Sequence, residues 1–164
     1  MKFNEFNYMS AALEIFAAAV TAVMLIGCFL ERKHKTKSGK LFVWCLISQT
    51  AMLLVDAPIW ILLANPKPEN VIPIKILSFS SDAFLCVLIS LYAYCLTEYI
   101  NERKKISYGY TNLITVLCGI SLVLWLINAF NGMYIYYDAT GLDQTGPHYL
   151  LSQAFNVVLP AMTM

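Results

Sequence analysis

Charged residues are scarce in this chain of 164 amino acids. Only 13% of the residues are Asp, Glu, Lys or Arg, whereas a soluble domain usually contains about 25%. Hydrophobic residues make up 59% of the chain and gather in long runs that a soluble core does not need. The net charge of +1, with the basic residues clustered beside these runs, gives no indication of nucleic-acid binding. The composition therefore predicts an integral membrane protein.

The familiar motifs of catalysis and metal binding are missing as well. The sequence contains no glycine-rich phosphate loop, no G-x-S-x-G elbow, no H-E-x-x-H helix and no dinucleotide-binding fingerprint. The five cysteines lie within the hydrophobic runs and lack the spacing of a zinc site. His148 lies near Asp138 and Asp143 in the sequence, but three ligands on one mobile loop are a poor indication of a metal. We therefore expect no active site, no cofactor and no metal site.

Four hydrophobic runs are long enough to cross a bilayer, which takes about 20 helical residues. They cover residues 8–30, 41–63, 74–100 and 111–130. A fifth run, 150–164, reaches the end of the chain short of this length, either as a truncated span or as a short interfacial segment. Because nothing polar closes it, we expect an all-α polytopic transmembrane helix bundle with four complete spans and a truncated fifth. Residues 1–164 then form a single transmembrane domain, the incomplete N-terminal portion of a longer protein.

The distribution of Lys and Arg predicts the orientation of these spans. The segments 31–40 and 101–110 contain five and three of them, whereas 64–75 contains two and 131–153 contains none. Cationic loops stay on the cytoplasmic side because moving them across the membrane against the potential is costly. We therefore expect the N-terminus and the segment 131–153 outside, in a multi-pass protein of the bacterial cytoplasmic membrane.

The segment 131–153 is the most polar stretch between the runs. It contains four tyrosines, which we expect to anchor it at the lipid headgroups. Gly141, Gly146 and Pro147 are typical turn residues and would lead the chain into the fifth run. We interpret the segment as an outer loop that forms a lid. The candidate lid residues are Tyr136, Tyr137, Asp138, His148 and Tyr149.

Ionisable residues inside a span are costly, so each of them is a candidate for function. One acid lies in the outer half of each of the first three runs, and amide side chains lie at a similar depth in the fourth and fifth. The candidate ligand-binding residues are therefore Glu14, Asp56, Asp82, Asn128, Gln153 and Asn156. No Lys or Arg lies beside them, and Lys75 would reach Asp82 only by turning inward along its helix. Uncompensated acids favour a cationic or hydrogen-bond-donating ligand.

Three interpretations of these polar groups stay open. Helical spacing places Glu14 on one face with Ser10 and Thr21, and Asp82 on one face with Ser78. The side chains can serve as interhelical hydrogen bonds, each typically contributing about 1 kcal/mol or less. They can also line a ligand or ion pocket that is open to the outside, or they can form a proton pathway.

The order of these features is similar to a known kind of receptor. The chain has a basic first loop and a short second loop with proline. Before the fifth run it contains the elements YYD (136–138) and GPHY (146–149). This layout resembles the seven-helix type of multi-span input domain at the N-termini of bacterial sensor histidine kinases and diguanylate cyclases. The resemblance implies an input module without a catalytic site of its own. It would detect an extracytoplasmic or membrane stimulus and pass it to a cytoplasmic output domain.

The expected partners follow from this interpretation. They are the lipid bilayer, an unknown small ligand and, for a receptor, a second copy of the chain in a homodimer. A ligand can signal only by binding two helix packings with different affinities. The alternative function is a small transporter or channel that moves ions or protons through the intramembrane carboxylates. A further alternative is a membrane scaffold without a ligand.

Overall fold

The computed structural model describes residues 3–31, 35–137, 143–150 and 161. Its long helices are α1 (Phe3–Leu30), α2 (Lys37–Ala64), α3 (Val71–Asn101) and α4 (Gly109–Asn131). A one-turn 3₁₀ helix, η2 (Pro68–Asn70), precedes α3, and two short strands, β1 (Ile135–Tyr137) and β2 (Asp143–Thr145), follow α4. All four long helices are long and apolar enough to cross a membrane, which confirms the predicted helical, multi-span architecture. The fifth run lies outside the described residues except for Leu150 and Ala161.

The helices extend further than the hydrophobic runs that predicted them. Helix α2 begins four residues before its run, at Lys37, because Thr36 caps it. The hydroxyl oxygen of Thr36 accepts a hydrogen bond of 3.0 Å from the backbone N–H of Gly39. Hydropathy therefore marked the apolar part of each helix, whereas a side-chain cap decided where α2 begins.

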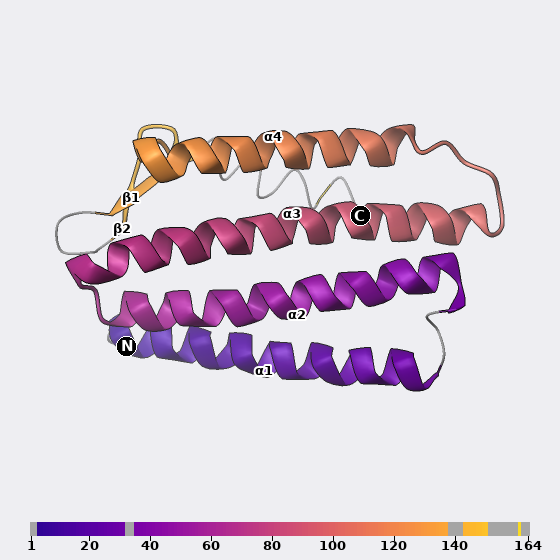
Figure 1. Cartoon of the computed structure of the whole chain (residues 1–164). Coiled ribbons are helices and arrows are strands. Elements are labelled where there is room, and N and C mark those ends of the chain that lie inside the picture. The colour runs from indigo at the N-terminus through magenta and orange to yellow at the C-terminus, as the bar shows by residue number, and fades with distance from the viewer. Residues whose placement is uncertain (1–2, 32–34, 138–142, 151–160, 162–164) are drawn as a thin grey trace.

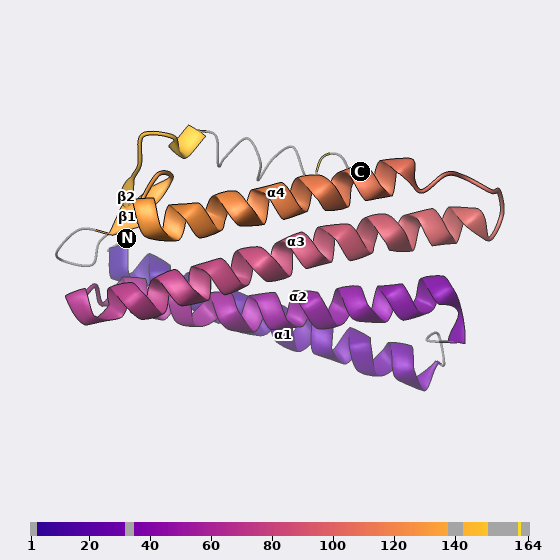
Figure 2. The ribbon, with the colours of Figure 1, turned by 45° about the horizontal axis from the view of Figure 1, so that its top comes forward.

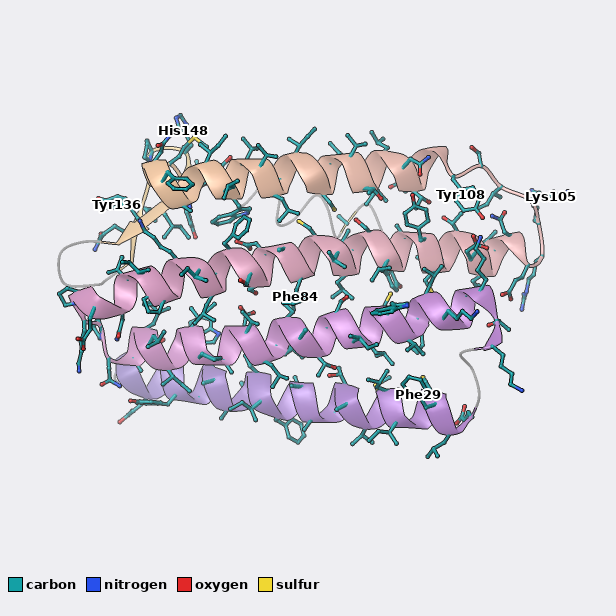
Figure 3. All side chains as sticks on the ribbon, viewed as in Figure 1. Phe29, Phe84, Lys105, Tyr108, Tyr136 and His148 are labelled. Atoms are coloured by element: carbon teal, nitrogen blue, oxygen red, sulfur yellow. The ribbon has the colours of Figure 1, made fainter. Side chains whose placement is uncertain are left out.

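The helices lie side by side in chain order, so that α1 packs on α2, α2 on α3 and α3 on α4 (Figures 1 and 2). Neighbours are antiparallel because short connections join them. The result is a row of helices with two distinct ends. We call residues 31, 35–40 and 98–110 the basic end, and the first two turns of α1 with residues 65–75, 128–137 and 143–150 the hairpin end. Figure 3 shows Lys105 and Tyr108 at the basic end and Tyr136 and His148 at the hairpin end.

Large apolar side chains cover the outward faces of the row. Phe16 and Val23 on α1 are 68% and 69% exposed, and Phe130 on α4 is 82% exposed. In water, such faces would be costly, but lipid chains are as apolar as these side chains. The exposure pattern therefore agrees with a membrane environment.

The contacts between neighbouring helices use small and β-branched residues. Ala11, Ala18 and Cys28 of α1 are buried, and their spacing places them on one helix face. On the same side, the hydroxyl groups of Thr21 and Thr50 share a hydrogen bond of 3.0 Å between α1 and α2. Small residues let helix backbones approach closely, which is how membrane helices gain packing energy.

A buried cluster fills the middle of the α3–α4 contact. It consists of Cys86, Ile89, Ala93, Ile114 and Cys118, which are between 1% and 7% exposed. Side chains on both helices interdigitate here, so α3 and α4 are held together between the two ends of the row.

The segment after α4 forms an antiparallel hairpin in which Ile135 pairs with Thr145 and Tyr137 with Asp143. The sequence analysis expected an outer loop here, so among the described residues this small sheet departs from the predicted all-α fold. The β-branched and aromatic residues of β1 favour extended backbone. Three residues are too short a run for hydrophobic periodicity to reveal.

Candidate functional site

A cavity of about 400 Å³ lies toward the hairpin end, where all four long helices and β1 contribute to its wall. Helix α2 supplies Asp56, Ile59 and Trp60, and helix α3 supplies Ser78 and Asp82. Most of these side chains lie three or four residues apart on their helices, which places them on one face. The cavity therefore arises where the inward faces of neighbouring helices meet below the hairpin.

Three carboxyl groups from three different helices line this one cavity: Glu14, Asp56 and Asp82. Asp56 lies close enough to interact electrostatically with both of the others, and Ser81 of α3 also lines the cavity. The structure thus brings together the acids that the sequence analysis placed at a common depth. Within the described part of the chain, no group of three or more His, Cys, Asp or Glu side chains is arranged to hold a metal ion.

Lys75, near the start of α3, also lines the cavity. Its ammonium group donates a hydrogen bond of 3.3 Å to the backbone carbonyl of Ala129 on α4. The salt bridges among the described residues do not include Lys75. Lys75 therefore does turn inward, but it joins α3 to α4 instead of neutralising Asp82.

Two tryptophans give the cavity aromatic walls. Trp60 packs edge-on against Phe6 of α1 at 6.3 Å, and Trp125 packs edge-on against Tyr134 at 5.5 Å between ring centroids. Indole faces attract organic cations, and this attraction strengthens where water is excluded. Acids and indoles in one cavity therefore form a surface that suits a cation with an apolar body.

Asn128, another predicted ligand-binding residue, lines the cavity but is already engaged. Its side-chain oxygen accepts hydrogen bonds from the backbone N–H groups of Tyr134, at 2.6 Å, and Ile135, at 3.2 Å. It is only 6% exposed. Asn128 thus ties the end of α4 to the start of the hairpin, and its oxygen does not remain free for a ligand.

Two glycines let the chain fold back over α4. Gly132 ends the helix with φ of 60°, and its N–H donates to the carbonyl of Asn128 at 2.8 Å. A Cβ on Gly146 would lie 2.5 Å from the carbonyl oxygens of both Gly132 and Met133. Because backbone crosses backbone there, only glycine fits at position 146, and the hairpin places Ile135 in the cavity wall.

The predicted lid residues do not line the cavity where the structure describes them. Tyr136 is 45% exposed and pairs with Gln144 across the hairpin. His148 is exposed, and Tyr149 is half-buried. The side chain of Tyr137 and the predicted site residues Asp138, Gln153 and Asn156 lie outside the described residues.

The expectation that all tyrosines of this segment anchor at the headgroups was wrong for Tyr134. This side chain is 1% exposed and packs on Trp125. Burial raises the pKa of its phenol. Among the described residues, its hydroxyl group has no hydrogen-bond partner. The return of the hairpin over α4 turns Tyr134 inward, which a composition-based interpretation of the segment does not reveal.

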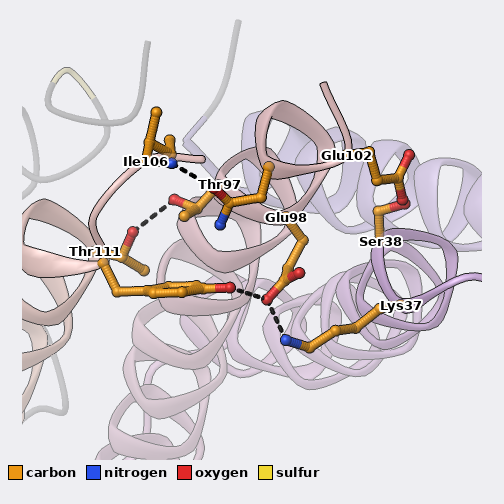
Figure 4. Close-up of polar contacts among 9 residues, drawn as sticks. Lys37, Ser38, Thr97, Glu98, Glu102, Ile106 and Thr111 are labelled. Atoms are coloured by element: carbon orange, nitrogen blue, oxygen red, sulfur yellow. Dashed lines mark hydrogen bonds and ion pairs between the residues drawn. The ribbon is translucent and has the colours of Figure 1, made fainter. Parts of the chain in front are cut away.

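The sequence analysis overlooked Glu98, an acid at the basic end that is only 8% exposed. Its carboxylate accepts hydrogen bonds from the ammonium group of Lys37 on α2 and from the hydroxyl group of Tyr108 before α4 (Figure 4). Nearby, the hydroxyl groups of Thr97 and Thr111 share a hydrogen bond of 2.7 Å. Glu98 lies inside the predicted span 74–100, so the cost of intramembrane charge was an available signal. Its partner Lys37 lies 61 residues away in the sequence, so that bond could not be read from the local pattern.

These observations define a cavity whose acids form no salt bridge among the described residues, and a separate, hydrogen-bonded acid at the opposite end. Comparison of the chain with protein-family models, with curated proteins and with solved structures gives no match. The function must therefore be argued from the residues of the cavity.

Proposed function

We propose that this chain is a membrane-embedded sensory input module that binds a small organic ammonium ion in the cavity at the hairpin end. One observation carries the proposal: about 400 Å³ of space is walled by acids from three helices and by two tryptophans. Small-molecule sites typically measure about 300–1,000 Å³ and combine apolar walls with a few polar groups. An ammonium ion would supply the positive charge that the three acids lack.

The charge distribution supports an orientation with the N-terminus and the cavity on the outside. Of the Lys and Arg residues that the structure describes, two lie at the hairpin end and the others at the basic end, namely Lys35, Lys37, Lys40, Arg103, Lys104 and Lys105. Cation-rich loops favour the cytoplasmic side. In the bacterial cytoplasmic membrane, the ligand would enter from outside the cell, and the run 150–164 would supply a further span.

Signal transfer follows from the way the cavity is built. A cation held between Glu14, Asp56 and Asp82 draws three helices together, so it binds one helix packing more tightly than another. The shift would reach the basic end through α2 and α3, where a cytoplasmic output domain or partner reads it. In this proposal, the chain works as a homodimer and has no catalytic site of its own.

Packing favours a receptor over a transporter. Beyond the cavity, the buried cluster around Ile89 and Ile114 fills the contact between α3 and α4. At the basic end, the bonds of Glu98 join α2, α3 and the start of α4. Transport would require both of these contacts to open, whereas ligand sensing requires only small shifts of the helices.

Tryptophan fluorescence tests the proposal directly, because Trp60 and Trp125 line the cavity. The chain, with Trp44 replaced by Phe to remove the background signal, is titrated in lipid nanodiscs with ammonium ions from methylammonium to choline. We expect a saturable change that the variants Asp56→Asn and Asp82→Asn abolish.

The control is Glu69→Gln, which removes an exposed acid outside the cavity at the same end. This variant should bind as the parent does. The absence of a saturable response, or an equal response in the two aspartate variants, would contradict ligand binding. Uptake of the same ions into proteoliposomes would show that the chain is a transporter and would contradict the receptor proposal.

A further inference from the structure

A second cavity, of about 440 Å³, lies at the basic end between the first turns of α2 and the last turns of α3. Tyr92, Leu96 and Tyr99 line it at steps of four and three residues, so they form one face of α3. Gly39 and Phe42 of α2 face them. Since glycine has no side chain, the first turn of α2 leaves the groove open. The walls are mainly carbon, as a hydrocarbon chain requires.

The groove opens toward the surroundings of the row. Phe42, Tyr92 and Tyr99 are 37%, 43% and 51% exposed, so their rings form an open rim. Tyrosine rings such as these two prefer the depth of the lipid headgroups, with their apolar bodies toward the chains. The groove therefore lies where a phospholipid places its phosphate and its first methylene groups.

A cation stands at the mouth of the groove. The guanidinium group of Arg103 lies 5.5 Å from the centre of the Tyr99 ring, and it donates a hydrogen bond of 3.4 Å to the Tyr99 hydroxyl group. Lys35 and Lys40 flank the part of α2 that lines the groove. Guanidinium groups bind phosphate through paired N–H donors.

The two acids of α3 and its C-cap at this end, Glu98 and Glu102, are already bonded. The carboxylate of Glu102 accepts a hydrogen bond of 2.6 Å from the hydroxyl group of Ser38, which lines the groove. Glu98 is paired with Lys37. Arg103, Lys35 and Lys40 thus lie near the groove together with Glu102, whose carboxylate is bonded to a neutral hydroxyl group, so positive charge is in excess at the mouth of the groove.

We propose that this groove binds an anionic phospholipid, with an acyl chain between Phe42 and Leu96 and the phosphate at Arg103. Basic pockets between membrane helices on the cytoplasmic side are suited to anionic headgroups. The bound lipid would span the contact between α2 and α3 at the end opposite the acidic cavity. This site is independent of the proposed ammonium site.

The test measures binding of fluorescent phosphatidylglycerol to the purified chain in a neutral maltoside detergent. We expect saturable binding that unlabelled phosphatidylglycerol displaces at least about fivefold better than phosphatidylcholine, since each Arg or Lys near an anionic lipid contributes about 1 kcal/mol. The variant Arg103→Gln should weaken binding by about fivefold. The variant Leu96→Trp, which fills the groove, should abolish it.

The matched control is Lys67→Gln, which removes a cation from the hairpin end and should leave binding unchanged. Circular dichroism and thermal unfolding verify that each variant is folded, and Arg103 is exposed, so its replacement leaves the core intact. Equal displacement by the two lipids, or an equal loss in Lys67→Gln and Arg103→Gln, would overturn the proposal. Displacement by millimolar inorganic phosphate as effective as by phosphatidylglycerol would also overturn it, because the site would then bind phosphate alone.

Discussion

The two ends of the row both hold acidic side chains between helices, but the surroundings of these acids differ. At the basic end, Glu98 accepts hydrogen bonds from Lys37 and Tyr108 and is 8% exposed. At the hairpin end, Asp56 and Asp82 share a cavity with Glu14, and the nearby Lys75 bonds a backbone carbonyl instead. A buried charge whose partners are complete serves as a joint between helices. A group of like charges without such partners inside a membrane is instead a candidate binding site.

The ends also differ in packing, because the acid at one end is in direct contact with its partners and the acids at the other end surround a cavity. The carboxylate of Glu98 joins three elements at one point, whereas the acids near the hairpin surround a cavity of about 400 Å³. Loss of an acid should therefore have opposite consequences at the two ends. Stability should respond at the basic end, and ligand binding should respond at the hairpin end.

The largest expected effect comes from the hairpin itself. Gly146→Ala would place a Cβ 2.5 Å from two backbone carbonyl oxygens, which cannot move aside as a flexible side chain can. We expect the free energy of unfolding to fall by about 3 kcal/mol, at the upper end of the usual cost of overpacking. Unfolding in mixed detergent micelles measures this change.

Gly119→Ala is the control, because a Cβ on Gly119 has no neighbour within 4 Å. This variant should be unchanged or more stable by up to about 1 kcal/mol, since alanine favours helix. An equal loss in both glycine variants would mean that the hairpin is not held on α4 as described.

The second effect separates the two kinds of acid. Glu98→Gln removes the charge that holds Lys37, so we expect a lower thermal midpoint. Asp56→Asn relieves repulsion from Glu14 and Asp82, so we expect an unchanged or higher midpoint. Thermal unfolding monitored by circular dichroism compares the variants, with Glu69→Gln as the surface control. If Asp56→Asn were as destabilised as Glu98→Gln, the cavity acids would be interhelical bonds and not a binding site.

The third effect concerns Lys75, whose ammonium group shares the cavity with the acids. Removing it with Lys75→Met leaves more negative charge for an incoming cation. Opposite charges about 4 Å apart interact by about 1 kcal/mol even in water, so we expect about fivefold tighter ammonium binding. The fluorescence titration measures it. Lys67→Met, which removes an exposed cation from the same end, should bind as the parent does. Weaker binding by Lys75→Met would show that Lys75 holds the cavity open.

The smallest effect is expected from the hydroxyl pair at the basic end. Thr97→Val removes the bond of 2.7 Å to Thr111 while keeping the shape of the side chain. Interhelical hydrogen bonds in membranes contribute about 0.6 kcal/mol on average, so we expect a loss of that size. Unfolding in mixed micelles measures it, with Thr97→Ser as the variant that keeps the hydroxyl. If Thr97→Val lowered the free energy of unfolding more than Glu98→Gln, the threonine pair would contribute more than Glu98 to holding the helices together at this end.

The sequence predicted the helices well and the site in part. The four spans could be predicted because apolar length is a local property that each segment carries alone. The depth of Glu14, Asp56 and Asp82 followed from counting along these spans, and the three acids line one cavity. The hairpin was missed because its strands have only three residues each, and β pairing is not a local property.

Composition and hydropathy were therefore sufficient to predict a helical, multi-span chain, and the sequence also shows that most of its cations lie in two loops. The partners of each polar group were decided only by the tertiary structure. Lys37 and Glu98 are 61 residues apart, so their bond depends on which helix faces which. Asn128 was a candidate ligand residue by depth. In the folded chain, its side-chain oxygen accepts hydrogen bonds from two backbone N–H groups of the hairpin segment. Hydropathy adds up along the chain, whereas the pairing of buried polar groups depends on side chains that meet only after the helices pack.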